Sequence, residues 1–237
     1  MKPVLVLQHM DTDGPGYLAT WLRARGVPFV VRNSAAGEDF PPSMDGFGAL
    51  AVLGGEMSVN DPLPSLRRAE TLIRESLSLD RPVIGHCLGG QLMATALGAR
   101  VTDSPAPEIG WQPVRIGAAS QSRAWFGNVD EAVVFQWHHE SFEVPPGAEL
   151  LAGSDACPHQ AFAIGRHLAM QFHVEVDAAK LALWSASRDP TFLRLQRECP
   201  TVQSGEAMQA QGASALAAQQ ALADRLYARW LGSAAQG

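Results

Sequence analysis

Cysteine, positive charge and long apolar runs are all scarce in this sequence of 237 residues. Its three cysteines, an odd number at wide spacing, do not form the pattern of a disulfide framework and indicate a reducing compartment. Lys and Arg total 18 against 24 Asp and Glu, and no Lys/Arg cluster offsets the net charge of -6, so we expect no nucleic-acid partner. No apolar stretch approaches the roughly 20 residues of a membrane-spanning helix, so we expect no membrane association.

The first residues also lack the pattern of a signal peptide. The start MKPVLVLQHMDTDG has one Lys and a short apolar run that soon meets Asp11 and Asp13. We therefore expect a cytoplasmic protein. What the sequence does contain is 46% hydrophobic residues, which is enough for a chain of this length to bury a substantial core in a single domain.

Short apolar runs alternate with helical patterns over the first hundred residues. The expected strands are 4–7, 27–31, 49–53 and 82–84, and the expected helices are 15–25, 64–79 and 90–97. This alternation predicts a parallel sheet with helices on both faces. Ligands gather at the carboxyl ends of the strands in such sheets, and glycine-rich breaks occur at two of these ends, at Gly54 and Gly85.

The pattern changes in the second half of the chain. From Gly110 onward, β-type runs at 132–137, 160–164 and 168–172 are separated by Pro and Gly turns, so this half adds strands without helices between them. The last fifty residues are rich in Ala and Gln, and Leu222, Leu226 and Trp230 at i, i+4 and i+8 mark an amphipathic terminal helix. We expect this helix to pack on the core rather than to bind a partner.

A strand-to-helix turn with glycines on both sides of a cysteine is the strongest local signal. In GHCLGGQ (residues 85–91), the glycines permit a tight backbone that lifts Cys87 above the sheet, as in a nucleophile elbow. The N-terminus of the following helix favours thiolate over thiol, and a backbone N–H after Cys87 points to where an oxyanion would form. The alternative is a buried cysteine that only packs, and this reading stands for Cys157 and Cys199, which have no such setting.

A thiol nucleophile needs a base within hydrogen-bond reach and a third group that fixes the tautomer of that base. His173 and Glu175 follow the apolar run 168–172, and residues i and i+2 of an extended chain point to the same side. A His-x-Glu pair alone is a weak signal, because strand ends often carry such residues. Gly54-Gly55, at the end of another strand, offers a backbone donor without an obstructing side chain, although a tight turn is the simpler explanation.

Five segments, taken together, resemble the class I glutamine amidotransferases, which use a Cys-His-Glu triad. They are LGGEMSVND (53–61), PVIGHCLGGQLMA (82–94), EIGW (108–111), FQWHHESF (135–142) and QFHVE (171–175). The resemblance runs in order from about residue 4 to 175, and their joint occurrence is far more specific than any one of them. It is closest to free-standing members similar to the glutaminase domain of GMP synthase.

The resemblance implies a role for each matching residue. Cys87 would be the nucleophile, His173 the general base and acid, and Glu175 the carboxylate that orients the histidine. Gly55 and Leu88 would supply the backbone N–H groups of an oxyanion hole.

The substrate contacts are also implied by the resemblance. Gly54 and Gln91 would line the site for the substrate glutamine, and the backbone around His138, His139 and Glu140 would meet its α-carboxylate and α-amine. No cofactor and no metal are implied. The small-molecule substrate would be glutamine or a γ-glutamyl compound.

Three departures from the family pattern bear on these expectations. Val174 replaces the usual Pro between the His and the Glu, which should change local stiffness more than chemistry. The usual His-Gly-Asp is His-His-Glu here, with His139 and Glu140 as the altered pair. This change leaves open whether the substrate is glutamine or another compound. His86, beside the nucleophile, should point away from Cys87 and pack.

Several functional readings stay open. No P-loop motif or second domain is present to activate an acceptor with ATP, so either a separate synthetase subunit receives the ammonia or the protein works alone as a γ-glutamyl hydrolase. A catalytically silent binding or regulatory module of the same fold is a further alternative. A metal site built from His138, His139, Glu140 and His159 is disfavoured, because adjacent histidines on a strand project to opposite faces.

We accordingly predict a flavodoxin-like open α/β sheet, mostly parallel and flanked by helices, with an added antiparallel β portion and a C-terminal helical extension. Residues 1–190 would form the amidotransferase domain, and 191–237 a helical extension packed on the same domain. The oligomeric state is left open by the sequence.

Overall fold

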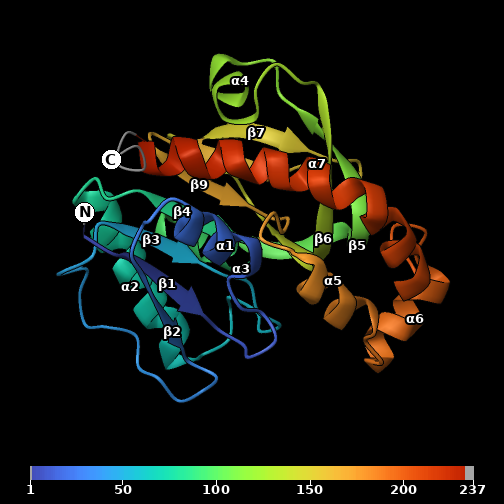
Figure 1. Cartoon of the computed structure of the whole chain (residues 1–237), viewed down its shortest axis with the longest axis horizontal. Helices are drawn as coiled ribbons and strands as arrows, with labels where there is room; N and C mark the ends of the chain where they lie inside the picture. The colour runs from blue at the N-terminus through green and yellow to red at the C-terminus, as the bar shows by residue number, and fades with distance from the viewer. Residues whose placement is uncertain (1, 233–237) are drawn as a thin grey trace.

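The computed structural model describes residues 2–232, and within this range a nine-stranded mixed sheet carries helices on both faces (Figure 1). The strands are β1 (Val4–Gln8), β2 (Phe29–Asn33), β3 (Ala49–Val52), β4 (Val83–His86), β5 (Val101–Ile116), β6 (Glu131–Phe142), β7 (Glu149–Gly153), β8 (Ala161–Ile164) and β9 (His167–Met170). The helices are α1 (Gly16–Ala24), α2 (Pro64–Ser78), α3 (Leu88–Ala96), α4 (Ser120–Phe126), α5 (Ala178–Ser185), α6 (Pro190–Glu198) and α7 (Gly205–Leu231). Of these helices, none is both long and apolar enough to cross a membrane.

One half of the sheet is parallel, in the order β2-β1-β3-β4-β9. Its central strands are apolar except for Gln8 and His86 at the carboxyl ends of β1 and β4, because helices cover both faces, and every residue of β1, β3 and β4 is buried. The carboxyl ends of parallel neighbours meet at one edge. The loops that follow β4 and β9, which are neighbours in space but about 80 residues apart in sequence, therefore begin side by side.

The other half of the sheet is antiparallel and continues from β9 in the order β8-β7-β5-β6. The long strands β5 and β6 pair from Val101–Phe142 to Arg115–Glu131, with an irregularity between Asp103 and Glu108. This part of the chain brings residues 137–140 of β6 to the same edge as the loops after β4 and β9, since these residues line the same pocket as Cys87 and His173.

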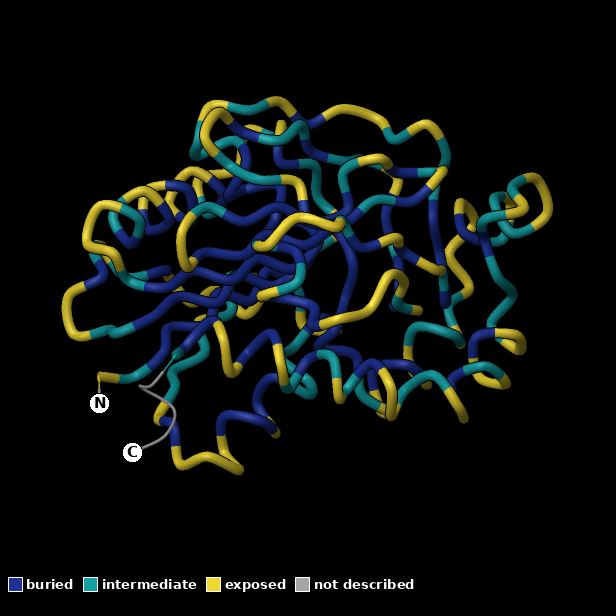
Figure 2. Tube along the Cα trace, turned by 90° about the horizontal axis from the view of Figure 1, so that it is seen from above, coloured by how far each residue is buried: buried dark blue, intermediate teal, exposed yellow. Residues whose placement is uncertain are grey.

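The long helix α7 packs over one face of the sheet (Figure 1). It begins at an N-cap where the Ser204 side chain accepts a hydrogen bond from Ala207 N, and its residues Leu226, Tyr227 and Trp230 lie in the same core cluster as α1. Helices α2 and α3 cover the opposite face. The strands are buried at the centre, and exposed residues gather on loops and outer helical turns (Figure 2).

The predicted fold class is confirmed, with adjustments. Four strand pairs are parallel and four are antiparallel, so the added portion is as large as the parallel core. Helix α4 lies between two strands of the half that was expected to have none, and α5, which precedes the predicted helical extension, was not expected either. Helix α3 begins at Leu88 rather than at residue 90, and β9 ends at Met170, so the chain leaves the sheet two residues earlier than expected.

Candidate active site

Cys87 lies on a sharp turn between β4 and α3, with φ 49° and ψ -111°. A positive φ is rare for residues other than glycine, and here the surroundings hold it: the Cys87 N–H donates to Met170 O at 2.9 Å. A Cβ on Gly89 would collide with the backbone of Val52, and one on Gly90 with the backbone of Met170. The glycines therefore let α3 pack directly against β3 and β9, which places its first turn behind the thiol.

His173 and Glu175 meet as predicted from their spacing. His173 Nδ1 lies 2.6 Å from Glu175 Oε1, while His173 Nε2 has no hydrogen-bond partner within the described chain. The backbone N–H of His173 donates to Phe135 O at 2.9 Å, and the edge of the ring packs on Trp184, with ring centroids 4.9 Å apart. Val174, between the two, is buried in the core. The imidazole is thus fixed on three sides, with Nε2 as its free ring nitrogen.

The charges around His173 favour its protonated form. Burial would lower the pKa of His173, but the negative charges of Glu175 and Cys87 and the hydrogen bond to Glu175 raise it to about 10. Burial would likewise raise the pKa of Glu175, yet the positive charges of His173 and Lys180 hold it well below its usual range. The arrangement therefore supports an anionic carboxylate that stabilises an imidazolium.

Sequence reasoning missed two residues behind the triad, Asp13 and Lys180. The buried ammonium of Lys180 lies 2.6 Å from Asp13 Oδ1 and 3.4 Å from Glu175 Oε1. A buried lysine needs such partners because an isolated charge is costly away from water. Neither residue belongs to a recognisable motif, since Asp13 lies in the loop after β1 and Lys180 in the first turn of α5. The only sequence signal was that Asp13 follows a strand that ends at the same edge of the sheet.

His86 occupies the other side of Glu175. Its fully buried ring packs edge-on against Tyr227 of α7, and its Nε2 lies 3.8 Å from Glu175 Oε2 and 3.4 Å from the Tyr227 hydroxyl. Burial lowers the pKa of His86, which favours its neutral form. The prediction that His86 packs is consistent with these contacts, which additionally bring it to the triad carboxylate.

Cys87 and His173 open into one pocket of about 430 Å³. Of the predicted site residues, those that line it are Gly55, Cys87, Gln91, His138, His139, Glu140 and His173. Gly54, Leu88 and Glu175 lie behind this lining. Further residues of the pocket, which the sequence did not single out, come from the loop after β1 and from α5 and α6: Met10, Thr12, Asp13, Leu183, Trp184, Ser187, Asp189, Thr191, Phe192 and Leu195.

The two glycines after β3 have different surroundings. A Cβ on Gly54 would collide with Asp13 and with the His173 ring, so Gly54 makes room for these side chains, and its contact with substrate stays a prediction. A Cβ on Gly55 would come within 2.9 Å of the Leu88 side chain, which places the two residues predicted to donate to an oxyanion side by side next to Cys87. Their role in binding an oxyanion stays a prediction.

The residues expected to bind the α-amino acid end lie together at the end of β6. Gln91 Nε2 is 3.3 Å from Glu140 O and 3.4 Å from Gln171 Oε1, and the Glu140 carboxylate accepts a hydrogen bond from Ser58 Oγ at 2.9 Å. His138 is buried and His139 is exposed, as expected for neighbours on a strand.

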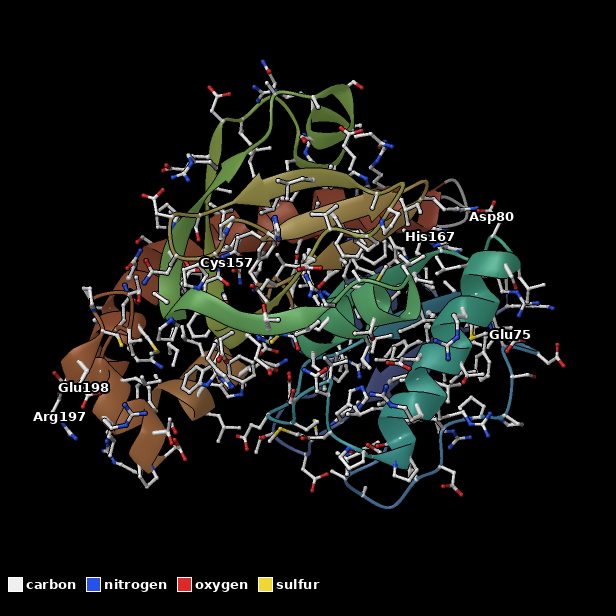
Figure 3. All side chains as sticks on the ribbon, turned by 180° about the vertical axis from the view of Figure 1, so that it is seen from behind. Glu75, Asp80, Cys157, His167, Arg197 and Glu198 are labelled. Carbon is white, nitrogen blue, oxygen red and sulfur yellow. The ribbon has the colours of Figure 1, made fainter. Side chains whose placement is uncertain are left out.

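His138 belongs to a second buried polar cluster beneath the pocket. Its Nδ1 lies 3.1 Å from Glu140 O, and its Nε2 lies 3.2 Å from Glu108 Oε2 without the alignment of a hydrogen bond. Cys157, which lies close to β5 in the view from behind (Figure 3), has its sulfur within 4.8 Å of ligand atoms of both Glu108 and His138. The described residues that group closely enough to hold a metal are this trio and Asp13, His173 and Glu175. Neither group includes His139 or His159.

Comparison with known proteins gives a family assignment that agrees with this geometry. The model of the glutamine amidotransferase class-I family matches residues 18–181, which is most of the chain. The chain therefore belongs to the class I glutamine amidotransferase family, whose members are usually glutamine-hydrolysing enzymes, and it is related to the glutaminase domain of GMP synthase.

Relatives support the same assignment. The glutamine amidotransferase-like protein YfeJ of Salmonella typhimurium is 34% identical over 180 residues, which cover 70% of this chain and 74% of that protein. The GMP synthase of Clostridium perfringens is 33% identical over 111 residues, covering 45% of this chain but only 21% of that enzyme. The crystal structure of a glutamine amidotransferase from Methylobacillus flagellatus superposes with a TM-score of 0.89 at 35% identity, covering 98% of this chain and 94% of that one.

Proposed function

We propose that this protein hydrolyses the γ-carboxamide of glutamine or of a γ-glutamyl compound through a thioester on Cys87, releasing ammonia or an amine. The observation that carries the proposal is the orientation of His173. Glu175 Oε1 lies 2.6 Å from His173 Nδ1, and His173 Nε2 has no partner among the described residues. His173 lines the same pocket as Cys87, whose thiol is carried on a strained turn. A silent binding module would have no need of this arrangement.

The reaction follows from these positions. The Cys87 thiolate attacks the γ-carbonyl carbon, and the oxyanion that forms is stabilised by backbone N–H groups, for which Gly55 and Leu88 are the nearest candidates. The His173 imidazolium protonates the leaving nitrogen, so that the C–N bond breaks and a γ-glutamyl thioester remains. His173, now neutral, takes a proton from water, whose attack on the thioester releases glutamate and restores the thiolate–imidazolium pair.

The α-amino acid end of the substrate would lie at the end of β6. Backbone groups of residues 138–140 and the Gln91 amide face this part of the pocket, and no Lys or Arg lines it among the described residues. We propose that recognition of the α-carboxylate and α-amine therefore depends on backbone groups and on the Glu140 carboxylate.

The domain boundary and the partner remain proposals as well. We place the amidotransferase domain at 1–190 and the extension at 191–237, and α7 of that extension shares a core with α1 rather than standing apart. A separate synthetase subunit would be needed only if ammonia is delivered to an acceptor. The cytoplasmic location is proposed on the same basis as before, the scarcity of cysteine.

The test is to incubate the purified protein with glutamine and with γ-glutamyl amides and to measure released glutamate and ammonia or amine. Acid quenching followed by mass spectrometry should find a γ-glutamyl adduct on the peptide that contains Cys87. Glutamate release without any adduct on Cys87, or release that persists in a folded Cys87→Ala variant, would contradict the proposal.

A further inference from the structure

One wall of the active-site pocket is apolar and aromatic, and it comes largely from outside the part of the chain that the family model covers. The family match ends at residue 181. The wall consists of Ile109, Trp137, Leu183, Trp184, Phe192 and Leu195, four of which follow that position. Helices α5 and α6 therefore extend the pocket beyond what the matched family region provides.

The wall is preformed rather than loose. The ring centroid of Trp137 lies 5.6 Å from that of Trp184 and 5.2 Å from that of Phe192. Trp184 is tied to the loop after β1 through its Nε1, which donates to Thr12 O at 3.2 Å. Phe192 is held in the first turn of α6, where its N–H donates to the Asp189 side chain at 2.9 Å. A rigid apolar surface of this kind binds an apolar group without an entropic penalty for ordering the wall.

The chemistry determines which part of the substrate meets the wall. His173 Nε2 must protonate the leaving nitrogen, so this nitrogen lies beside the imidazole in any productive complex. Trp184 packs directly on that imidazole, with ring centroids 4.9 Å apart. A substituent on the leaving nitrogen therefore extends toward Trp184 and the rest of the wall, whereas the α-amino acid end lies on the side of His138 and Glu140.

The charges of the pocket further restrict which substituents on the leaving nitrogen it can accept. The described lining contains the acidic residues Asp13, Glu56, Glu140 and Asp189 but no Lys or Arg. A carboxylate on the leaving group would meet repulsion from Glu56, Glu140 and Asp189, since Asp13 is already paired with Lys180, and the lining offers it no Lys or Arg as a partner. At the rim, the Leu183 side chain is 52% exposed, an apolar surface that ammonia would leave uncovered.

Resting on the proposed function, we infer that the preferred substrate is a γ-glutamyl amide of an uncharged apolar amine, with an aromatic or bulky aliphatic group, rather than glutamine or a γ-glutamyl peptide. The amine is released, and the γ-glutamyl group passes to Cys87 and then to water as glutamate. The wall binds the amine substituent, and the acidic lining disfavours substituents that bear a carboxylate.

Three substrates test the inference in one assay: glutamine, γ-glutamyl-phenethylamide and γ-glutamyl-phenylalanine. The last two differ only by a carboxylate on the leaving group. Because covering the aromatic ring removes apolar surface from water, kcat/KM for the phenethylamide should exceed that for glutamine by at least about tenfold. It should exceed that for γ-glutamyl-phenylalanine by a similar factor. Equal or better turnover of either competitor would overturn the inference.

A matched pair of variants tests the wall itself. Leu183→Gln should lower the ratio of kcat/KM for the phenethylamide to that for glutamine several-fold, mainly through KM. Leu79→Gln is the control, because Leu79 is 48% exposed and follows α2, outside the pocket lining. An unchanged ratio in Leu183→Gln, or an equal fall in both variants, would rule out a role for the wall.

The outcomes also separate this inference from the proposed function. Hydrolysis of glutamine with a Cys87 adduct, but without preference for the phenethylamide, would overturn the inference and leave the function standing. If no substrate is hydrolysed and none acylates Cys87, both fall.

Discussion

The chain contains two buried clusters of the same three residue types, and their surroundings differ. The first is Cys87, His173 and Glu175 beyond the carboxyl ends of the parallel strands β4 and β9. The second is Cys157, His138 and Glu108 in the antiparallel half. Comparing them identifies which features a Cys-His-Glu set needs beyond proximity.

The first difference lies in the free atoms. In the triad, His173 Nε2 has no partner and Cys87 lines the pocket. In the second cluster, His138 has an oxygen within 3.2 Å of each ring nitrogen, and Cys157 does not line the pocket. Burial and the nearby carboxylate of Glu108 raise the pKa of the Cys157 thiol to about 11. A thiol that is held neutral and lies outside the pocket lining offers no nucleophile to a substrate in the pocket.

The second difference lies in the partners of the carboxylate. Glu175 has the ammonium of Lys180 at 3.4 Å in addition to the His173 imidazole. Glu108 instead accepts hydrogen bonds from the neutral groups Ser154 Oγ at 2.9 Å and Gln160 Nε2 at 2.6 Å. The triad carboxylate is thus held as an anion by charge, which suits the stabilisation of an imidazolium during turnover. The other carboxylate ties strands β5, β7 and β8 together.

The largest expected effect separates the two thiols. Cys87→Ala should reduce γ-glutamyl amide hydrolysis by at least about 1,000-fold, because no other group can form the thioester. Cys157→Ala should stay within about threefold of the parent in kcat/KM. Both are measured by amine release under the same conditions, with circular dichroism as the check on folding. Comparable losses in the two variants would mean that the second cluster takes part in the chemistry.

A smaller difference is expected for the two carboxylates. Glu175→Gln should lower kcat by roughly 10² to 10⁴, because the neutral amide neither fixes the His173 tautomer nor balances its charge. Glu108→Gln should stay within about tenfold in kcat, since its effect is on the packing of the cluster around His138. Steady-state kinetics on one substrate compare them. A Glu108→Gln variant as inactive as Glu175→Gln would break the distinction between the clusters.

The positions of Cys87, His173 and Glu175 could be predicted from the sequence because these residues lie at strand ends with distinctive neighbours. Alternating apolar runs predict which strands are parallel, and parallel neighbours bring their carboxyl ends together whatever their separation in sequence. The glycines around Cys87 then mark the strained turn, which the structure has at φ 49°. His173 and Glu175 follow β9 within a few residues, so the His-x-Glu spacing alone was enough to predict that their side chains meet.

The remaining parts could not be predicted because their partners are set by tertiary packing. Lys180 belongs to no motif, and only the loop after β1 makes it the buried partner of Asp13. The aromatic wall depends on how α5 and α6 fold back toward Trp137, for which neither periodicity nor spacing gives a signal. Glu108 and Cys157 are likewise joined only by the pairing order of the antiparallel strands.

The buried ammonium gives the next prediction. Lys180→Met removes the cation shared by Asp13 and Glu175, and leaving buried carboxylates uncompensated should lower the free energy of unfolding by about 3–5 kcal/mol. The double variant Lys180→Met/Asp13→Asn should recover part of that loss, because it removes one of the two orphaned charges. Urea unfolding at pH 7 measures both. If the double variant is no more stable than the single one, the ion pair is not the source of the loss.

The pH dependence of hydrolysis gives the smallest effect and tests the charge balance directly. The pKa of His173 is raised to about 10 from the ordinary value of 6.5, so the imidazolium that protonates the leaving nitrogen persists through neutral pH. kcat/KM should fall about tenfold per pH unit above about pH 10. The stabilisation that His173 gains on folding is fully present below pH 6.5 and is lost as pH rises through about 10, so circular dichroism at each pH must separate unfolding from deprotonation. In Glu175→Gln the alkaline decline of the residual activity should begin more than about one pH unit lower than in the parent, because the charge that raises the pKa of His173 is gone. An alkaline limb in the same place for both proteins would mean that Glu175 does not set the protonation of His173.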